Sequence, residues 1–348
     1  MTASSCADPA RSASADEGFA DRLMAEALLI IDTGRRRDVT LRLIGGLAVR
    51  SYAADLGFMR REFSDIDLIG RSVETARLYG LLAAFGYEEN RHVTLATAGG
   101  QLQFVKPTRL LESRAHVLKR PRPLGEPNRS APVVDHIDVF LDVMSMDHDV
   151  DVRDRLGIDP FAISPADVLL TKLQIGDIAE KDVHDVIALL KDVPLGDADD
   201  GACIAVPRVA RVCAHDWGIW RDVTSNLELV ALRPGDYSLS DAELVRVQGR
   251  IAVLASAIAD ERKSLRWRLR SQLGTRLPWR REVEEREGSP AVAPLHSQTT
   301  LVACESCEHA VEVSQQLADL PAAPLACPRC GSLDIGPWSP DFGEPAAA

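Results

Sequence analysis

Seven residues, FSDIDLI at positions 63–69, constrain the fold most, because they place Asp65 and Asp67 two residues apart within an apolar run. Alternate side chains of a β-strand share a face, so this spacing predicts that both carboxylates point the same way while Ile66 and Leu68 point into a core. Two aligned carboxylates repel each other unless a cation lies between them. We expect Mg²⁺, or Mn²⁺ in its place, since Mg²⁺ takes one or two carboxylates together with substrate phosphates.

The segment before this stretch ends in a pair of glycines. Residues 40–46, TLRLIGG, predict an apolar strand, and residues 47–56 predict a helix. Between them, Gly45 and Gly46 predict a tight turn whose backbone can come close to a bound phosphate. The predicted order is therefore strand, glycine pair, helix, loop, and strand with two aspartates.

A third acid is expected on a neighbouring strand. Residues 133–144, VVDHIDVFLDVM, alternate in the manner of a strand. When two acids hold a metal, a third carboxylate completes a second metal site or takes a proton from an attacking hydroxyl. Asp138 is the preferred candidate, Asp142 the alternative and Asp135 the third choice. Each of them, taken alone, also fits a solvated strand residue.

This order of motifs resembles the nucleotidyltransferase superfamily with a polymerase-β-like core. The residues that match are Gly45, Gly46, Asp65 and Asp67. In that family the glycine pair holds the phosphates of the nucleotide and the acidic pair holds Mg²⁺. The resemblance implies an α+β fold with a mixed sheet, and a third acid for which Asp138 is the match.

One departure from the family pattern lies between the two motifs. Eighteen residues, 47–64, separate the glycines from Asp65, and the family usually has fewer. We assign the excess to the loop at residues 57–61, which would lengthen the helix–strand connection without moving either end. The alternative interpretation is a plain Gly-Gly turn with two solvated aspartates on an edge strand.

Two later helices extend the resemblance. Bacterial abortive-infection toxins of the nucleotidyltransferase type, and their toxin–antitoxin relatives, carry a leucine-rich helix with a lysine, followed by a Lys/Arg-Asp-x-x-Asp helix. Here LLTKL supplies Lys172, and EKDVHDVIALL supplies Lys181, Asp182 and Asp185. The resemblance, over residues 41–190, implies that Lys172 contacts the nucleotide phosphates and that Asp185 supports the site. The alternative for Lys172 is a surface lysine that snorkels to solvent.

Near the C-terminus, four of the seven cysteines form two Cys-x-x-Cys pairs, Cys304 with Cys307 and Cys327 with Cys330. Nineteen residues separate the pairs. Four thiolates at this spacing predict a closed, structural Zn²⁺ site, and the segment resembles a zinc ribbon. A segment this short buries too little core to fold alone, so the metal is expected to fold it.

A basic segment runs from Arg262 to Arg281, with eight cations and with Trp267 and Trp279 among them. Arginines interleaved with aromatic rings suit a single-stranded RNA acceptor, where charge follows the backbone and rings stack on bases. The alternative is that the segment has a structural role within the protein, in which the acidic residues at 282–287 neutralise the cations and the two tryptophans pack against other side chains.

Composition and patterning set the organisation. The net charge of −12 argues against wholesale coating of nucleic acid, and no apolar run reaches the ~20 residues of a membrane span. The odd cysteine count with metal-like pairing indicates the cytoplasm.

We expect a disordered tail (1–17), a nucleotidyltransferase domain (18–195), a helical region (196–287), a linker (288–299), a zinc ribbon (300–338) and a second tail (339–348). A hairpin is predicted by residues 91–96 and 101–106, on either side of a glycine pair.

The expected function is transfer of a nucleoside monophosphate from a triphosphate to a hydroxyl of an RNA end, a protein or a small molecule. The resemblance to toxins implies a role in a toxin–antitoxin or phage-defence pair, with an antitoxin protein as partner. The alternative is a non-catalytic adaptor that uses its zinc ribbon to contact a partner.

Overall fold

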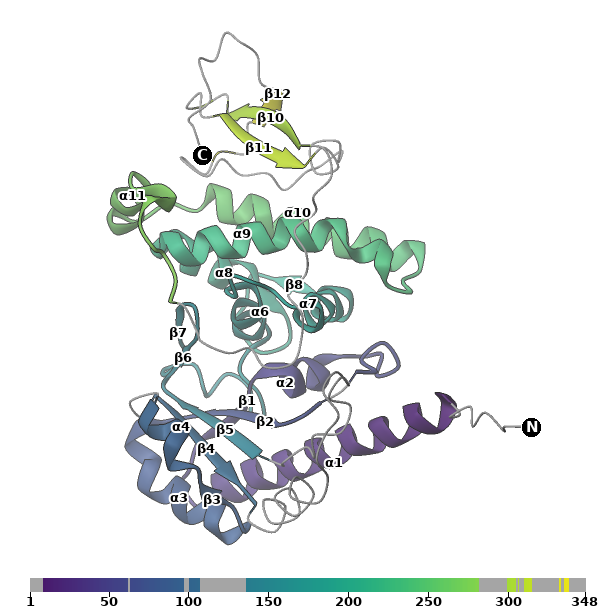
Figure 1. The fold of residues 1–348 in the computed structure, drawn as a ribbon, viewed down its shortest axis with the longest axis vertical. Coiled ribbons are helices and arrows are strands. Elements are labelled where there is room, and N and C mark those ends of the chain that lie inside the picture. The colour runs from purple at the N-terminus through teal and green to yellow at the C-terminus, as the bar shows by residue number, and fades with distance from the viewer. Residues whose placement is uncertain are drawn as a thin grey trace, which may run out of the picture. The chain divides into compact units, whose positions relative to one another are not determined.

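The computed structural model describes residues 9–61, 63–96, 100–106 and 136–281, and at the C-terminal end 299–304, 306, 310–314, 332 and 335–337 (Figure 1). The chain divides into two compact units. The first comprises Met1–Ser51, Asp55–Ser145 and Asp151–Ile163; the second comprises Tyr52–Ala54, Met146–Val150 and Ser164–Ala348. The expected domain boundary at 195–196 lies inside the second unit.

The first unit is built on a five-stranded sheet with the order β1-β2-β5-β4-β3. Its central pair, β2 and β5, is parallel, while the other neighbours are antiparallel. This mixed sheet and its helices confirm the expected α+β class. The strands are β1 (Leu41–Leu43), β2 (Ile66–Gly70), β3 (Glu88–Glu89), β4 (Gln101–Val105) and β5 (His136–Leu141).

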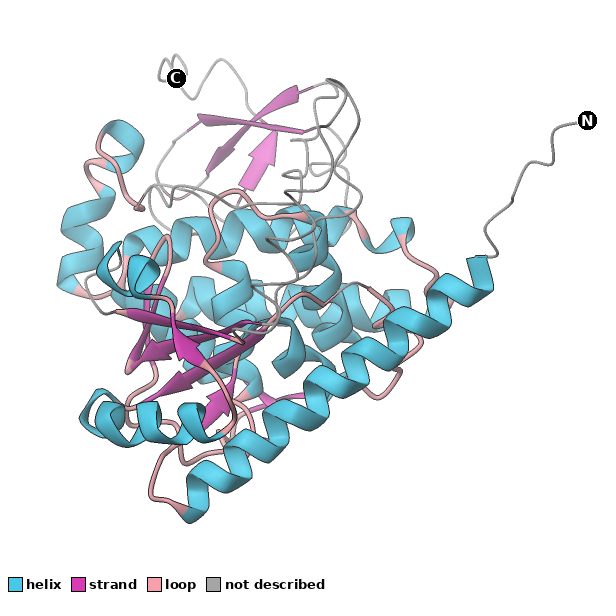
Figure 2. Ribbon diagram, turned by 60° about the horizontal axis from the view of Figure 1, so that its bottom comes forward, coloured by secondary structure: helices cyan, strands magenta, loops and turns pink. Residues whose placement is uncertain are grey.

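Alternation along β2 and β5 places buried aliphatic pairs on one face of the sheet and Asp67 and Asp138 on the other. Ile66 pairs with Ile137 and Leu68 with Val139, and all four side chains are fully buried. The long helix α1 (Pro9–Arg36) lies against β1, β2 and the helix α3 (Thr75–Ala84), as Figures 1 and 2 show. Burial of these apolar residues fixes the register of β2, because a slip of one residue would turn its aspartates into the core.

Two short helices of this unit differ from the sequence prediction. α2 spans Gly45–Tyr52, so it begins at the glycines themselves and ends four residues before the predicted end. α4 spans Arg91–Ala96, where a hairpin strand was predicted. That prediction is wrong because β4 pairs with β3 and β5 instead, while the carbonyl of Asn90 accepts bonds from the first turn of α4.

The second unit is helical over most of its described residues. α6 starts as its sequence predicts, with Ser164 as the N-cap and Pro165 in the first turn. α10 starts with a capping box between Ser240 and Glu243. The helices are α6 (Pro165–Leu173), α7 (Glu180–Asp192), α8 (Val206–His215), α9 (Trp217–Leu232), α10 (Asp241–Asp260) and α11 (Leu265–Ser271).

The C-terminal part contains a three-stranded antiparallel sheet of β10 (Thr299–Cys304), β11 (Ala310–Ser314) and β12 (Ile335–Pro337), with β10 in the centre. Cys304 ends β10 and is fully buried. Cys307, Cys327 and Cys330 lie outside the described residues. The zinc site therefore stays a prediction.

Candidate metal and nucleotide site

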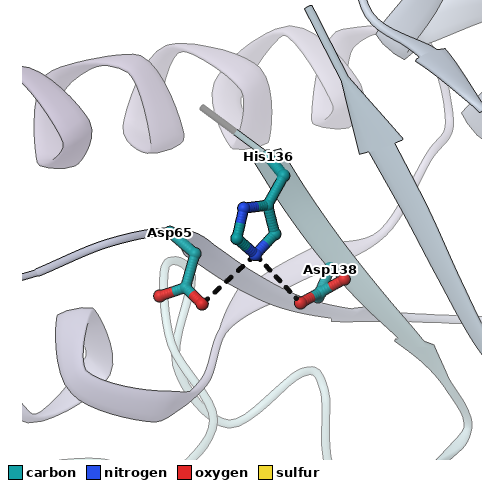
Figure 3. A group of neighbouring side chains, drawn as sticks. All are labelled: Asp65, His136 and Asp138. Carbon is teal, nitrogen blue, oxygen red and sulfur yellow. Dashed lines mark ion pairs between the residues drawn. The ribbon is translucent and has the colours of Figure 1, made fainter. Parts of the chain in front are cut away.

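The pairing of β2 with β5 brings the predicted acids together. Asp67 and Asp138 are register partners in this parallel pair. Asp65 immediately precedes β2, and His136 begins β5. Because residues two apart on a strand share a face, Asp65 joins Asp67 and His136 joins Asp138 on the same face of the sheet. Three of these side chains are drawn in Figure 3.

Three of the four side chains form a tight cluster. The Nε2 atom of His136 lies 3.4 Å from Oδ2 of Asp65 and 3.5 Å from Oδ2 of Asp138 (Figure 3). One ligand atom from each residue lies within 4.8 Å of the other two. Asp138 is buried, whereas Asp65 and His136 are partly exposed. The cluster therefore combines two carboxylates and an imidazole at a place that an ion from solvent can reach.

Asp138 is held from its other side. Gln103, its register partner on β4, donates a hydrogen bond of 3.0 Å from Nε2 to Oδ1 of Asp138. This bond leaves Oδ2 directed toward His136. Such a second contact fixes the orientation of the Asp138 carboxylate.

The glycine turn contacts the acidic pair directly. Gly45 has a φ of +63°, a conformation that residues with a Cβ rarely adopt. A Cβ placed on Gly45 would overlap Oδ2 of Asp67, and the amide of Ile44 donates to the backbone carbonyl of Asp67 at 3.0 Å. The two motifs that the sequence analysis set in order are thus in contact in the fold.

The long connection between the glycines and Asp65 also returns to the turn. The guanidinium of Arg61 fills the space that a Cβ on Gly46 would need. The same guanidinium carbon lies 4.3 Å from the ring centroid of Phe63, which holds it in place by a cation–π contact. The extra loop therefore places a positive charge beside the turn where phosphates were predicted to bind.

The alternative third acid is used differently. Asp142 follows β5 at the end opposite His136 and has a φ of +62°. Its carboxylate accepts hydrogen bonds from the amide of Ser72 at 3.2 Å and from the Ser72 hydroxyl at 2.5 Å. The structure thus brings Asp138, and not Asp142, to Asp65. Asp135 lies outside the described residues.

Lys172 belongs to the second unit and is buried there. Its Nζ lies 2.8 Å from Oδ1 of Asp182 and 2.9 Å from Oδ2 of Asp185. Asp182 is 4% exposed and Asp185 is 0% exposed. These contacts tie α6 to α7, so the snorkelling alternative for Lys172 does not hold.

The basic segment packs its aromatic rings inside the second unit. Trp267 is buried, with its ring 5.1 Å from that of Trp220 in an edge-to-face arrangement. The indole nitrogen of Trp279 donates to Asp222 at 3.0 Å. Arg270 lies 4.7 Å above the ring of Trp217. These contacts favour packing over base stacking, and the cations left on the surface are Arg262, Arg266, Arg268, Arg276 and Arg281.

Comparison with known proteins identifies no close relative. No family model matches the chain, and no curated protein matches its sequence. Among solved structures, it is similar to an antigenic nucleotidyltransferase-like protein from Paracoccidioides brasiliensis, with 12% identity over 70% of this chain and 95% of that chain. The TM-score is 0.33, which is too low to decide fold or function.

Sequence reasoning missed His136. The signal was present, because His136 lies two residues before Asp138 in the same predicted strand and so shares its face. Gln103 and Arg61 had no such signal, since both reach the site through contacts far apart in the sequence.

Among the described residues, no helix is long and apolar enough to cross a membrane.

Proposed function

We propose that the first unit is a divalent-cation-dependent nucleotidyltransferase domain. The observation that carries this proposal is the contact between the glycine turn and the acidic pair: Gly45 lies against the Asp67 carboxylate, and Asp67 is the register partner of Asp138. A phosphate site and an acidic cation site side by side are what transfer of a nucleotide requires. The polymerase-β-like resemblance of the sequence points to the same reaction.

Each residue has a role in this proposal. Asp65, Asp67 and Asp138 would hold the cation, whose positive charge would offset the negative charge of the phosphates. α2 begins at Gly45, so the free N–H groups of its first turn offer donors to the triphosphate. Asp138 orients or deprotonates the acceptor hydroxyl, which attacks the α-phosphorus. Positioning and charge neutralisation do most of the work.

The wider roles rest on the sequence. We propose an RNA end, a protein or a small molecule as acceptor, and an antitoxin protein as partner in the cytoplasm. A contact of Lys172 and Asp185 with the nucleotide also stays a prediction. So does the zinc ribbon, for which metal analysis of the purified, reduced protein should find about one zinc per chain.

The test is release of pyrophosphate from each of the four ribonucleoside triphosphates, with Mg²⁺ or Mn²⁺ and with total cellular RNA as acceptor. Asp67→Asn should abolish release because it removes a ligand of the cation. Asp151→Asn is the matched control, since Asp151 is an exposed aspartate of the same unit. No release by the parent protein with any triphosphate would favour the non-catalytic adaptor, and equal release by the parent and Asp67→Asn would overturn the site.

A further inference from the structure

The cluster at the head of β5 contains a nitrogen ligand that a magnesium site does not need. Mg²⁺ prefers oxygen ligands in a near-ideal octahedron and keeps several waters. A nitrogen ligand is accepted by first-row transition ions, with affinity that rises from Mn²⁺ through Fe²⁺ and Co²⁺, so Mn²⁺ is the weakest-binding member of this group. Carboxylates accept the same ions. One imidazole between two carboxylates is therefore a donor set that distinguishes these ions from Mg²⁺.

We propose that Asp65, His136 and Asp138 form a site that selects a first-row transition ion, with Mn²⁺ as its representative, over Mg²⁺. This inference rests on the proposed function, because it names the cation of the same site. It also makes His136 a metal ligand.

The distances fit this assignment. Two atoms that bind one ion at about 2.1 Å, at angles between a right angle and a tetrahedral one, lie roughly 3.0–3.4 Å apart. The separations of His136 Nε2 from the two carboxylate oxygens are 3.4 and 3.5 Å. The ligand atoms of all three residues lie within 4.8 Å of one another, so an ion can be held once the two carboxylates move closer together. With Asp67, the register partner of Asp138, as a further ligand, an octahedral ion still keeps positions for water or phosphate oxygens.

The surroundings of the cluster are built to hold it. β5 fixes His136 and Asp138 two residues apart on one face, and the bond from Gln103 fixes the Asp138 carboxylate. His136 keeps 25% of its side chain exposed and Asp65 keeps 32%. The cluster is thus both preorganised and open to solvent. The competing account is that His136 is only a charge partner that bridges the two carboxylates.

The experiment is a titration of the full-length protein, with the cluster free of added zinc, with Mn²⁺, in which electron paramagnetic resonance measures the free ion. Competition with Mg²⁺ gives the affinity for the second ion. We expect the parent to bind Mn²⁺ at least tenfold more tightly than Mg²⁺. His136→Asn replaces the nitrogen ligand with a carbonyl oxygen. It should lose about tenfold in Mn²⁺ affinity, which corresponds to about 1.4 kcal/mol, and less than threefold in Mg²⁺ affinity.

A second readout separates a ligand from a charge partner. The electron spin echo of bound Mn²⁺ should be modulated by a coordinated imidazole nitrogen in the parent and not in His136→Asn. His215→Asn is the control, because His215 is exposed and lies in the second unit. Bound Mn²⁺ without nitrogen modulation in the parent, or equal Mn²⁺ affinity in the parent and His136→Asn, would overturn the proposal.

Failure of this inference can be told from failure of the proposed function, because the titration contains no nucleotide. A parent that releases pyrophosphate but shows no preference for Mn²⁺ would refute only the choice of ion. A parent that binds Mn²⁺ through His136 but releases no pyrophosphate would refute only the transfer reaction.

Discussion

Replacement of Lys172 by methionine should destabilise the second unit strongly. Methionine has a similar shape but no charge, so Asp182 and Asp185 would lose the ammonium that now lies 2.8 and 2.9 Å from them. Both aspartates are buried, so water cannot replace the lost partner. Removal of one partner from a buried ion pair costs about 3–5 kcal/mol. With a urea m-value of roughly 2 kcal/mol/M, the unfolding midpoint should fall by about 1.5–2.5 M.

Tryptophan fluorescence during urea unfolding is a suitable assay, because the described tryptophans, Trp217, Trp220, Trp267 and Trp279, all lie in the second unit. Lys181→Met is the matched control and should leave the midpoint nearly unchanged, since Lys181 is exposed. Asp185→Asn in the Lys172→Met background should recover part of the loss, because it removes one of the two buried negative charges. A midpoint for Lys172→Met within about 0.3 M of the parent would refute this reasoning, and weakened triphosphate binding by the same variant would support the predicted phosphate contact.

Three further outcomes are expected. Gly45→Ala should lower the melting temperature more than Gly86→Ala. Both glycines have a positive φ, which costs a residue with a Cβ about 1–2 kcal/mol, but only at Gly45 would the added Cβ also meet a carboxylate. Equal melting curves of the two variants by circular dichroism would contradict the contact. The pKa of Glu243 is lowered from 4.5 by hydrogen bonds from Ser240, so the stability that this pair contributes is complete above pH 4.5 and is lost as the pH falls through the lowered value. Ser240→Ala should therefore flatten the pH dependence of the urea midpoint in that range, and an unchanged slope would rule the pair out. If RNA is the acceptor, the combined substitution of exposed arginines, Arg262→Ala, Arg266→Ala and Arg268→Ala, should weaken RNA binding in filter-binding assays and reduce its dependence on salt. Equal RNA affinity of this variant and the parent at two salt concentrations would dismiss the segment as an RNA site.

Local sequence patterns were sufficient for the elements that carry the acids. Alternation placed Asp67 and Asp138 on the same face of two neighbouring strands. The apolar residues directly before and after each aspartate had to face the core, so the aspartates point to the other side. The turn at Gly45 was predicted from the glycine pair alone, and the start of α6 from Ser164 followed by a proline. Each of these features depends on residues within a few positions of one another.

The features that sequence patterns did not predict depend on distant contacts. The pairing of Lys172 with Asp182 and Asp185 needed α6 and α7 to pack, and the sequence offered a surface lysine just as readily. The pattern of residues 91–96 fitted a strand, but β4 had its two neighbours already in β3 and β5. The place of Trp267 likewise followed from its neighbour Trp220 and not from the arginines beside it.

The parallel pairing of β2 with β5 has a consequence for synthesis of the chain. A parallel pair cannot close through a tight turn, and here about seventy residues separate Ile66 from its partner Ile137. At ~5–20 residues per second, β5 leaves the ribosome roughly 4–14 seconds after β2. During that interval Asp65 and Asp67 have left the ribosome, but His136 and Asp138 have not. The cluster of Asp65, His136 and Asp138 therefore cannot form in a nascent chain that ends before β5, however well the earlier residues have folded.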